Sequence, residues 1–319
     1  MAEDNHTTVI EFILLGLTSK PNLQTPLFVL IFTVYLLTLM GNLGLISLIR
    51  TSPRLHTPMY FFLCNLSIVD LCYSSVFSPK LLVGLLVGKK SISYCSCFAQ
   101  HFFFLAFVTT EVFLLAVMAY DRYLAICNPL LYSLSMPRRV CLQLVATSYV
   151  GGILNSFIQT SCLLPLPFCG PNVINHFFCD TNPLLELSCS DHRFNELLLV
   201  TFNGTISMSV LFIIITSYVY ILLSILRIRS ARGRHKAFST CASHLLAVAL
   251  FYVPAGLSHM QPGSKYLLEM EKVTAVFYTL IIPMLNPLIY SLRNAEVKEA
   301  FRRATARSVW SGGNSNIEP

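Results

Sequence analysis

The chain has 319 residues, of which 55% are hydrophobic and only 12% are charged, and its formal net charge is +7. Soluble domains carry about 25% charged residues, so this composition excludes an ordinary soluble enzyme or binding domain. The composition indicates a protein that lies mostly within a membrane.

Seven apolar runs are long enough to cross a bilayer as helices, since about 20 residues span a hydrocarbon core of roughly 30 Å. After them, Ala295–Arg303 (AEVKEAFRR) is amphipathic and predicts a short eighth helix along the membrane surface. The predicted fold class is an all-α, seven-transmembrane helix bundle, with residues 1–25 as an N-terminal tail, 26–292 as the bundle and 293–319 as a C-terminal tail. In chain order the predicted spans are Pro26–Ile49, Pro58–Leu82, Phe98–Ala119, Val140–Leu164, Leu197–Leu226, Thr240–Met260 and Val273–Leu292.

The basic residues predict the orientation of the bundle. If the N-terminus is outside, fifteen of the 22 Lys and Arg residues fall on the cytoplasmic side. The positive-inside rule therefore favours an extracellular N-terminus and a cytoplasmic C-terminus in the plasma membrane, and the net charge is no argument for nucleic acid binding. The N-terminus has acids where a cleaved signal has basic residues, so we expect the first membrane helix to target the chain.

The predicted exterior carries a glycosylation sequon at Asn5 and five cysteines. The oxidising exterior permits disulfides there. The loop between the fourth and fifth spans holds three of these cysteines and is too polar and Pro-rich to be helical, so it needs a covalent anchor. The five are Cys95, Cys97, Cys169, Cys179 and Cys189.

Six sequence motifs occur in a fixed order along the chain, each at a different span. They are Gly41-Asn42, LHTPMYFFLCNLSIVDLC, MAYDRYLAICNPLLY, Ser217-Tyr218, KAFSTCASHL and PMLNPLIYSLRN. This set resembles that of olfactory receptors, within the rhodopsin-like G-protein-coupled receptors, over about Gly41 to Asn294. The resemblance favours the disulfides Cys97–Cys179 and Cys169–Cys189, although sequence alone does not determine connectivity.

Asp121 and Arg122 end the third span, where an arginine reaches the interface at modest cost. They are either a simple interfacial anchor or, as the resemblance implies, a latch in which Asp121 holds Arg122 until the helices shift and the G protein binds. In similar receptors further residues near that level support the switch; here they are Tyr123, Tyr218, Asn286, Pro287 and Tyr290. His244 is expected to make a packing or hydrogen-bond contact at the inner end of the sixth span.

Two carboxyl groups, Asp70 and Glu111, lie deep in the second and third spans, where an ionisable residue is usually functional. With Asn42 and Asn286 they resemble the sodium pocket of rhodopsin-like receptors. The alternative is a protonated carboxyl pair that shares a hydrogen bond.

The ligand pocket is expected in the outer half of the bundle, between spans three, five, six and seven. Helical periods outward from Glu111 give most of the lining on span three, and comparable depths give the rest. Its mostly apolar character suits small, uncharged, volatile molecules, and Pro254 is expected to kink span six beside it. The predicted lining is Phe104, Leu105, Val108, Thr109, Phe202, Asn203, Ile206, Tyr252, Ala255, Gly256, His259, Val276 and Thr279.

The resemblance implies a receptor for a small volatile odorant that activates an olfactory-type stimulatory G protein and raises cyclic AMP. The other expected partners are membrane lipids, with no cofactor except a sodium ion at Asp70 and Glu111. No zinc-protease or phosphate-loop motif is present, so the chain is not expected to be an enzyme. The alternatives are a seven-helix receptor for a non-odorant molecule, a transporter, or a proton-conducting channel.

Overall fold

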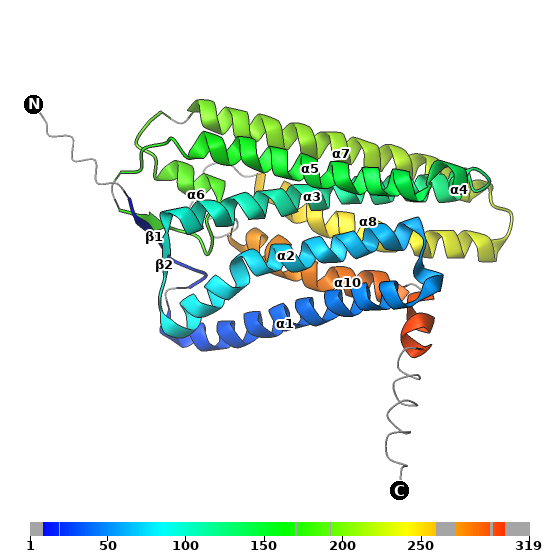
Figure 1. Ribbon diagram of the computed structural model, residues 1–319, viewed down its shortest axis with the longest axis horizontal. Helices are drawn as coiled ribbons and strands as arrows, with labels where there is room; N and C mark the ends of the chain where they lie inside the picture. The colour runs from blue at the N-terminus through cyan, green and yellow to red at the C-terminus, as the bar shows by residue number, and fades with distance from the viewer. Residues whose placement is uncertain are drawn as a thin grey trace, which may run out of the picture.

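The computed structural model describes residues 9–18, 20–169, 171–191, 193–259, 272–293 and 296–303. Long helices run side by side along one axis of the molecule (Figure 1). They are α1 (Pro21–Thr51), α2 (Pro58–Val87), α3 (Tyr94–Cys127), α5 (Arg138–Leu163), α7 (Arg193–Arg227), α8 (Ala231–His259) and a last helix that begins at residue 272 and includes η2 (Phe277–Ile281) and α10 (Ile282–Arg293).

The predicted helix bundle is confirmed. Within the described residues, six of these helices are long and apolar enough to cross a membrane, and α8 adds the shorter apolar stretch Cys241–Pro254. Helix α8 is less apolar overall because it starts with the polar sequence ARGRHK, and it continues through Pro254 to His259. The end of the predicted sixth span, Met260, lies outside the described residues.

Most helices extend beyond the predicted apolar spans. Helix α3 begins at Tyr94, where the Ser93 hydroxyl accepts a hydrogen bond from the Ser96 N–H (3.2 Å), and it ends at Cys127. Helix α2 continues past Leu82 to Val87 and stops at Gly88, whose φ of 71° suits a residue without Cβ. Hydropathy locates the hydrocarbon core, whereas capping residues determine where the backbone hydrogen bonds end.

Helix α3 is the centre of the bundle. Buried residues make up 67% of its most apolar window, against 28% for α1 and α7, and it packs against α2, α5, α7 and α8. The crossing of α3 with α5 is close because Gly152 has no side chain: a Cβ there would lie 2.3 Å from Thr110 Oγ1 and 2.5 Å from the Ala106 carbonyl oxygen. Side chains on α3 therefore reach every part of the core.

One end of the bundle, here called the disulfide end, carries a small sheet. Strand β1 (Glu11–Leu14) pairs antiparallel with β2 (Ser91–Ser93) and parallel with β3 (Val173–Ile174). Two disulfides, Cys97–Cys179 and Cys169–Cys189, tie the long loop to α3 and to itself, in the pairing that the resemblance favours, and Cys95 is free and exposed. The prediction of a loop without helix is wrong over α6 (Thr181–Glu186), because Asp180 caps its first N–H (2.7 Å).

The opposite end, here called the Arg122 end, carries the short elements η1 (Pro53–Leu55) and α4 (Tyr132–Ser135). Residues 296–303 form the predicted eighth helix, and Figure 1 shows it turning away from the bundle axis. The Tyr60 hydroxyl on α2 donates to Glu296 Oε2 (2.7 Å), and Glu299 forms exposed ion pairs with Arg302 and Arg303. This contact attaches the eighth helix to the start of α2.

Candidate functional site along the central helix

Two buried carboxyl groups face each other between α2, α3 and α10. Asp70 and Glu111 are almost fully buried, as is Asn286 of α10. The Asn286 side-chain amide donates to both Asp70 oxygens (3.2 and 3.1 Å) and lies 3.5 Å from Glu111 Oε1. The structure therefore brings together three of the four residues predicted for a sodium pocket.

The fourth, Asn42 on α1, lies deep in the core but bonds elsewhere. Its amide donates to the Thr38 carbonyl (3.0 Å) and to the Pro283 carbonyl (2.9 Å) in the last helix. Next to it, Gly41 packs closely on Pro287, since a Cβ at Gly41 would lie 3.0 Å from Pro287 Cγ. Asn42 thus joins α1 to the last helix rather than bonding to Asp70.

The chemistry of this centre fits a small hard cation or a proton. The oxygens Asn42 Oδ1, Glu111 Oε2 and Asn286 Oδ1 are buried and accept no hydrogen bond from the described part of the chain. No described Lys or Arg forms an ion pair with Asp70 or Glu111. A buried carboxylate without a partner is costly, and oxygen ligands are those that hard cations prefer.

At the Arg122 end, Asp121 is buried while Arg122 is half-buried. The carboxylate of Asp121 accepts a hydrogen bond from the Tyr132 hydroxyl of α4 (2.8 Å). Among the described residues there is no ion pair between Asp121 and Arg122. The motif therefore connects α3 to the short helix α4 that follows it.

Tyr218 and His244 form a relay beside Arg122. The Tyr218 hydroxyl of α7 bonds to His244 Nδ1 of α8 (2.9 Å), and His244 Nε2 donates to the Leu115 carbonyl of α3 (3.0 Å). Because a carbonyl only accepts, the proton of the neutral ring lies on Nε2 and Nδ1 accepts from the tyrosine. The expected hydrogen-bond contact of His244 is confirmed, and it links three helices.

Two other tyrosines predicted for the switch differ in environment. Tyr290 is buried in the core, and its hydroxyl has no partner in the described part of the chain. The charge of Arg122 lies within electrostatic range of Tyr218, His244 and Tyr290. Tyr123 instead packs its ring 5.8 Å from that of Tyr220 on α7.

Toward the disulfide end, part of the predicted ligand lining gathers into one apolar cluster. Phe104, Leu105 and Val108 of α3 pack with Val276 of the last helix. Ile206 and Tyr252 belong to the adjacent core cluster, and Phe107 contacts both clusters. Thr279 is buried, and its hydroxyl bonds to its own helix (2.5 Å to the Ala275 carbonyl oxygen).

Three other predicted lining residues point elsewhere. Phe202 is 41% exposed on the outer side of α7. Asn203 bonds to Gln159 of α5 (2.6 and 3.2 Å), and Thr109 accepts from Asn155 of α5 (2.9 Å). These polar groups join α3, α5 and α7 to one another. For Ala255, Gly256 and His259 the structure describes the helical backbone alone, so their place in the predicted lining stays a prediction, and the sequon residue Asn5 lies outside the described residues.

Sequence reasoning missed the aromatic side chains that cover the apolar cluster. The long loop inserts Phe177 and Phe178, with the Phe178 ring 4.8 Å from that of Phe104. Tyr73 of α2 stacks on Phe104 from another side (5.7 Å). The loop is held there because the Cys179 N–H donates to the Gln100 side chain of α3 (3.0 Å). The position of Phe178 directly before Cys179 is the one signal that could have placed it near α3.

The comparisons with known proteins agree with this architecture. A family model described as "Olfactory receptor" matches residues 31–307. Human olfactory receptor 5J2 is 56% identical over 304 residues, covering 95% of this chain and 97% of that protein, and mouse olfactory receptor 5G9 is 53% identical over 308 residues, covering 97% and 98%. The crystal structure of squid rhodopsin matches with a TM-score of 0.70 at 17% identity, over 92% of this chain and 88% of that one, which shows the fold. The chain therefore belongs to the olfactory receptor family, as a multi-pass membrane protein with the helix-bundle fold of rhodopsin, and it is not an enzyme.

Proposed function

We propose that this receptor binds small, uncharged, volatile organic molecules near the disulfide end and activates a stimulatory heterotrimeric G protein at the Arg122 end, raising cyclic AMP. One observation carries the proposal: the single central helix α3 holds Phe104 in the aromatic cluster, Glu111 in the polar centre and Arg122 at the opposite end. A ligand that shifts α3 against its neighbours acts on all three levels.

The proposed ligand is held by burial, because the cluster around Phe104 is aromatic and aliphatic. Phe177 and Phe178 cover it from the loop. A charged molecule would lose its hydration there without an ion-pair partner in that cluster. Volatile molecules of low polarity carry no such cost.

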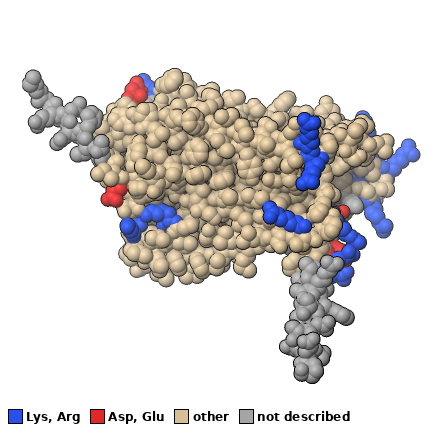
Figure 2. Space-filling model, viewed as in Figure 1, with Lys and Arg blue, Asp and Glu red and all other residues tan. Residues whose placement is uncertain are grey.

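The proposed orientation puts the disulfide end outside the cell and the Arg122 end in the cytoplasm of a plasma-membrane receptor. Figure 2 shows Lys and Arg side chains gathered at the Arg122 end. The positive-inside rule supports this assignment. It also places the disulfides in an oxidising compartment and makes Asn5 an accessible glycosylation site.

In the proposed switch, the relay from Tyr218 through His244 to the Leu115 carbonyl holds α7, α8 and α3 in the resting arrangement. Ligand binding moves α8 away from α3 and breaks this relay. The separation of α8 from α3 then lets the G protein reach Arg122, and Asp121 keeps its bond to Tyr132 in the loop that docks beside it. The contact among α3, α7 and α8 has two stable arrangements because the helices repack as rigid units.

The test is cyclic AMP accumulation in cells that express the receptor with an olfactory-type stimulatory G protein, screened against small volatile compounds. Arg122→Ala is expected to abolish the response at unchanged surface expression. Arg139→Ala is the matched control, since Arg139 is an exposed arginine at the same end. A full response from Arg122→Ala would contradict the proposed switch.

We propose further that Asp70, Glu111 and Asn286 hold a sodium ion in the resting receptor. The buried, unpartnered oxygens of Glu111 and Asn286 support this assignment. The thermal midpoint of the purified receptor is then higher in sodium chloride than in choline chloride at equal ionic strength, and Glu111→Gln reduces the difference. Equal midpoints in the two salts would favour the shared-proton alternative.

A further inference from the structure

A cavity of about 770 Å³ opens at the Arg122 end between α1, α2 and α5. It lies away from the proposed odorant site and from the Tyr218–His244 relay. Its walls come from the last turn of α1, the first three turns of α2 and the start of α5. The thirteen lining residues include no Asp or Glu.

The inner wall of this cavity is apolar. Ile49, Leu55, Cys64, Met136 and Cys141 are buried residues of the wall. Half-buried Phe61 and Ile68 continue it along α2. A wall of this kind suits hydrocarbon rather than a hydrated ion.

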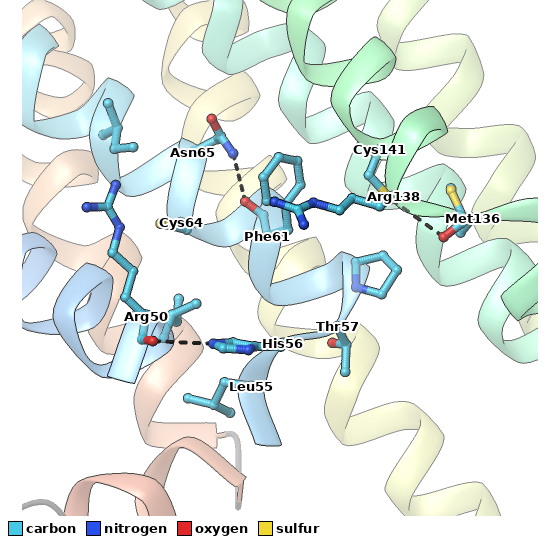
Figure 3. A pocket seen from close by; sticks show the side chains of 13 residues that line it. Arg50, Leu55, His56, Thr57, Phe61, Cys64, Asn65, Met136, Arg138 and Cys141 are labelled. Atoms are coloured by element: carbon cyan, nitrogen blue, oxygen red, sulfur yellow. Dashed lines mark hydrogen bonds between the residues drawn. The ribbon is translucent and has the colours of Figure 1, made fainter. Parts of the chain in front are cut away.

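The rim is basic. Figure 3 shows the Arg50 side chain on one side of the cavity and the Arg138 side chain reaching across from the other side toward Phe61. Both arginines are exposed, and neither forms an ion pair with a described residue. His56 lies between the walls and donates from Nε2 to the Arg50 carbonyl (3.3 Å).

Two helix N-termini, of α2 and α5, and one helix C-terminus, of α1, lie at this rim. Helix α2 starts at Pro58 and α5 at Arg138, both without a side-chain cap and without an acid in the first turn. The positive ends of both helices therefore add to the charge of the arginine side chains. The side chains that line the cavity are positive or neutral, and the Arg50 carbonyl at the C-terminal end of α1 is already bonded to His56.

We propose that this cavity binds an anionic phospholipid of the cytoplasmic leaflet. Arg50 and Arg138 hold the headgroup phosphate, and an acyl chain lies along the apolar wall beside Phe61. Guanidinium groups match phosphate geometry because they offer paired N–H donors. The inference rests on the proposed orientation, which puts the rim at the leaflet where anionic lipids concentrate. The bound lipid bridges α5 to α1 and α2.

Lipid retention by the purified full-length receptor tests this site. The receptor in detergent is mixed with a phosphatidylinositol phosphate or with phosphatidylcholine, and the bound fraction is measured by native mass spectrometry. We expect selective retention of the anionic lipid. Arg50→Gln with Arg138→Gln is expected to weaken it roughly thirtyfold, since each arginine near an anionic surface contributes about fivefold.

The matched control is Arg232→Gln with Arg234→Gln, which removes the same charge from the exposed start of α8 at the same end. Thermal midpoints and size-exclusion profiles verify that each variant is folded. If the glutamine variant is unstable, Arg50→Lys with Arg138→Lys is compared with the unaltered receptor instead. This lysine variant keeps both charges and is expected to retain most of the binding. Equal losses in the cavity and control variants would overturn the proposal, because they indicate unspecific attraction.

A soluble inositol phosphate separates the two sources of phosphate. We expect it to compete weakly, because it cannot use the apolar wall. Displacement of the lipid at equal concentration would overturn the assignment of a lipid. None of these measurements needs an odorant or a G protein, so failure here leaves the proposed receptor function unaffected.

Discussion

The Tyr218 hydroxyl of α7 lies 2.9 Å from His244 Nδ1 of α8, and the two rings stack with their centroids 5.7 Å apart. His244 in turn donates to the Leu115 carbonyl of α3. Three helices of the bundle thus meet at one imidazole, which is almost fully buried. Its Nδ1 accepts a hydrogen bond from the tyrosine, and its Nε2 donates one to the carbonyl.

Tyr218→Phe is expected to lower the thermal stability of the receptor. The change leaves Nδ1 of a buried histidine without a donor, which costs about 1 to 3 kcal/mol. The midpoint of thermal unfolding in detergent measures it. Tyr220→Phe is the control, because Tyr220 is 53% exposed on the same helix. A similar midpoint for both variants would show that the relay does not stabilise the bundle.

Gly152→Ala is expected to destabilise the contact of α3 and α5. The added Cβ would overlap Thr110 Oγ1 at 2.3 Å and the Ala106 carbonyl oxygen at 2.5 Å, and a carbonyl of a packed helix cannot move aside. Overpacking of this kind costs about 1 to 3 kcal/mol. Surface expression and thermal midpoint measure the loss.

Gly44→Ala is the matched control for Gly152→Ala. Gly44 lies inside α1, and a Cβ there meets nothing within 4 Å. Alanine is favoured over glycine in a helix interior by about 1 kcal/mol, so this variant is expected to be neutral or slightly more stable. Equal effects of the two changes would refute the close α3–α5 contact.

The bundle could be predicted because each apolar run, as a helix, is long enough to cross the hydrocarbon core of a bilayer. The small sheet could not, since its strands have four, three and two residues and Ile13 pairs with Val173 far along the chain. Such short strands carry no periodic signal. The pairing of β3 with β1 depends on the path of the long loop, which the two disulfides tether.

The contacts of Asp70, Glu111 and Asn286 were predictable from helical periods and motif resemblance, whereas the positions of the side chains in the predicted ligand lining were predictable only in part. Helix α7 is apolar on all sides, so its sequence does not specify its rotation about its own axis. That rotation exposes Phe202 and pairs Asn203 with Gln159. The contacts of Phe178 with Phe104 depend in the same way on the folded loop.

Loss of the Cys97–Cys179 disulfide is expected to destabilise the receptor more than loss of the Cys169–Cys189 disulfide. Cys97–Cys179 closes a separation of 82 residues and Cys169–Cys189 one of 20. Chain entropy then predicts losses of roughly 4 to 5 and about 3 kcal/mol. Cys97→Ser should therefore reduce surface expression more than Cys169→Ser.

Cys95→Ser is the control for the disulfide variants, because Cys95 is free and exposed two residues before Cys97. Its expression is expected to equal that of the unaltered receptor. Peptide mapping without reduction identifies the pairs directly. A peptide that joins Cys95 to Cys179 would contradict the pairing.

Acidification is expected to destabilise the loop that covers the aromatic cluster. The pKa of His176 is lowered to about 3, because burial removes its hydration and the Lys272 charge lies nearby. In the unfolded chain the pKa is about 6.5, so between these values the unfolded state binds more protons. The stability contributed by neutral His176 is therefore complete above pH 6.5 and falls as the pH drops toward 3, by about 2 kcal/mol at pH 5.

His176→Gln tests this pH dependence, since glutamine is neutral at every pH used and retains an acceptor for the Phe178 N–H. Thermal midpoints of the receptor and the variant are compared at pH 7 and pH 5. The drop between these values should be smaller in the variant, while every other histidine titrates equally in both. An identical drop would mean that His176 is protonated without cost, and that the ring is hydrated rather than buried between Phe177 and Phe178.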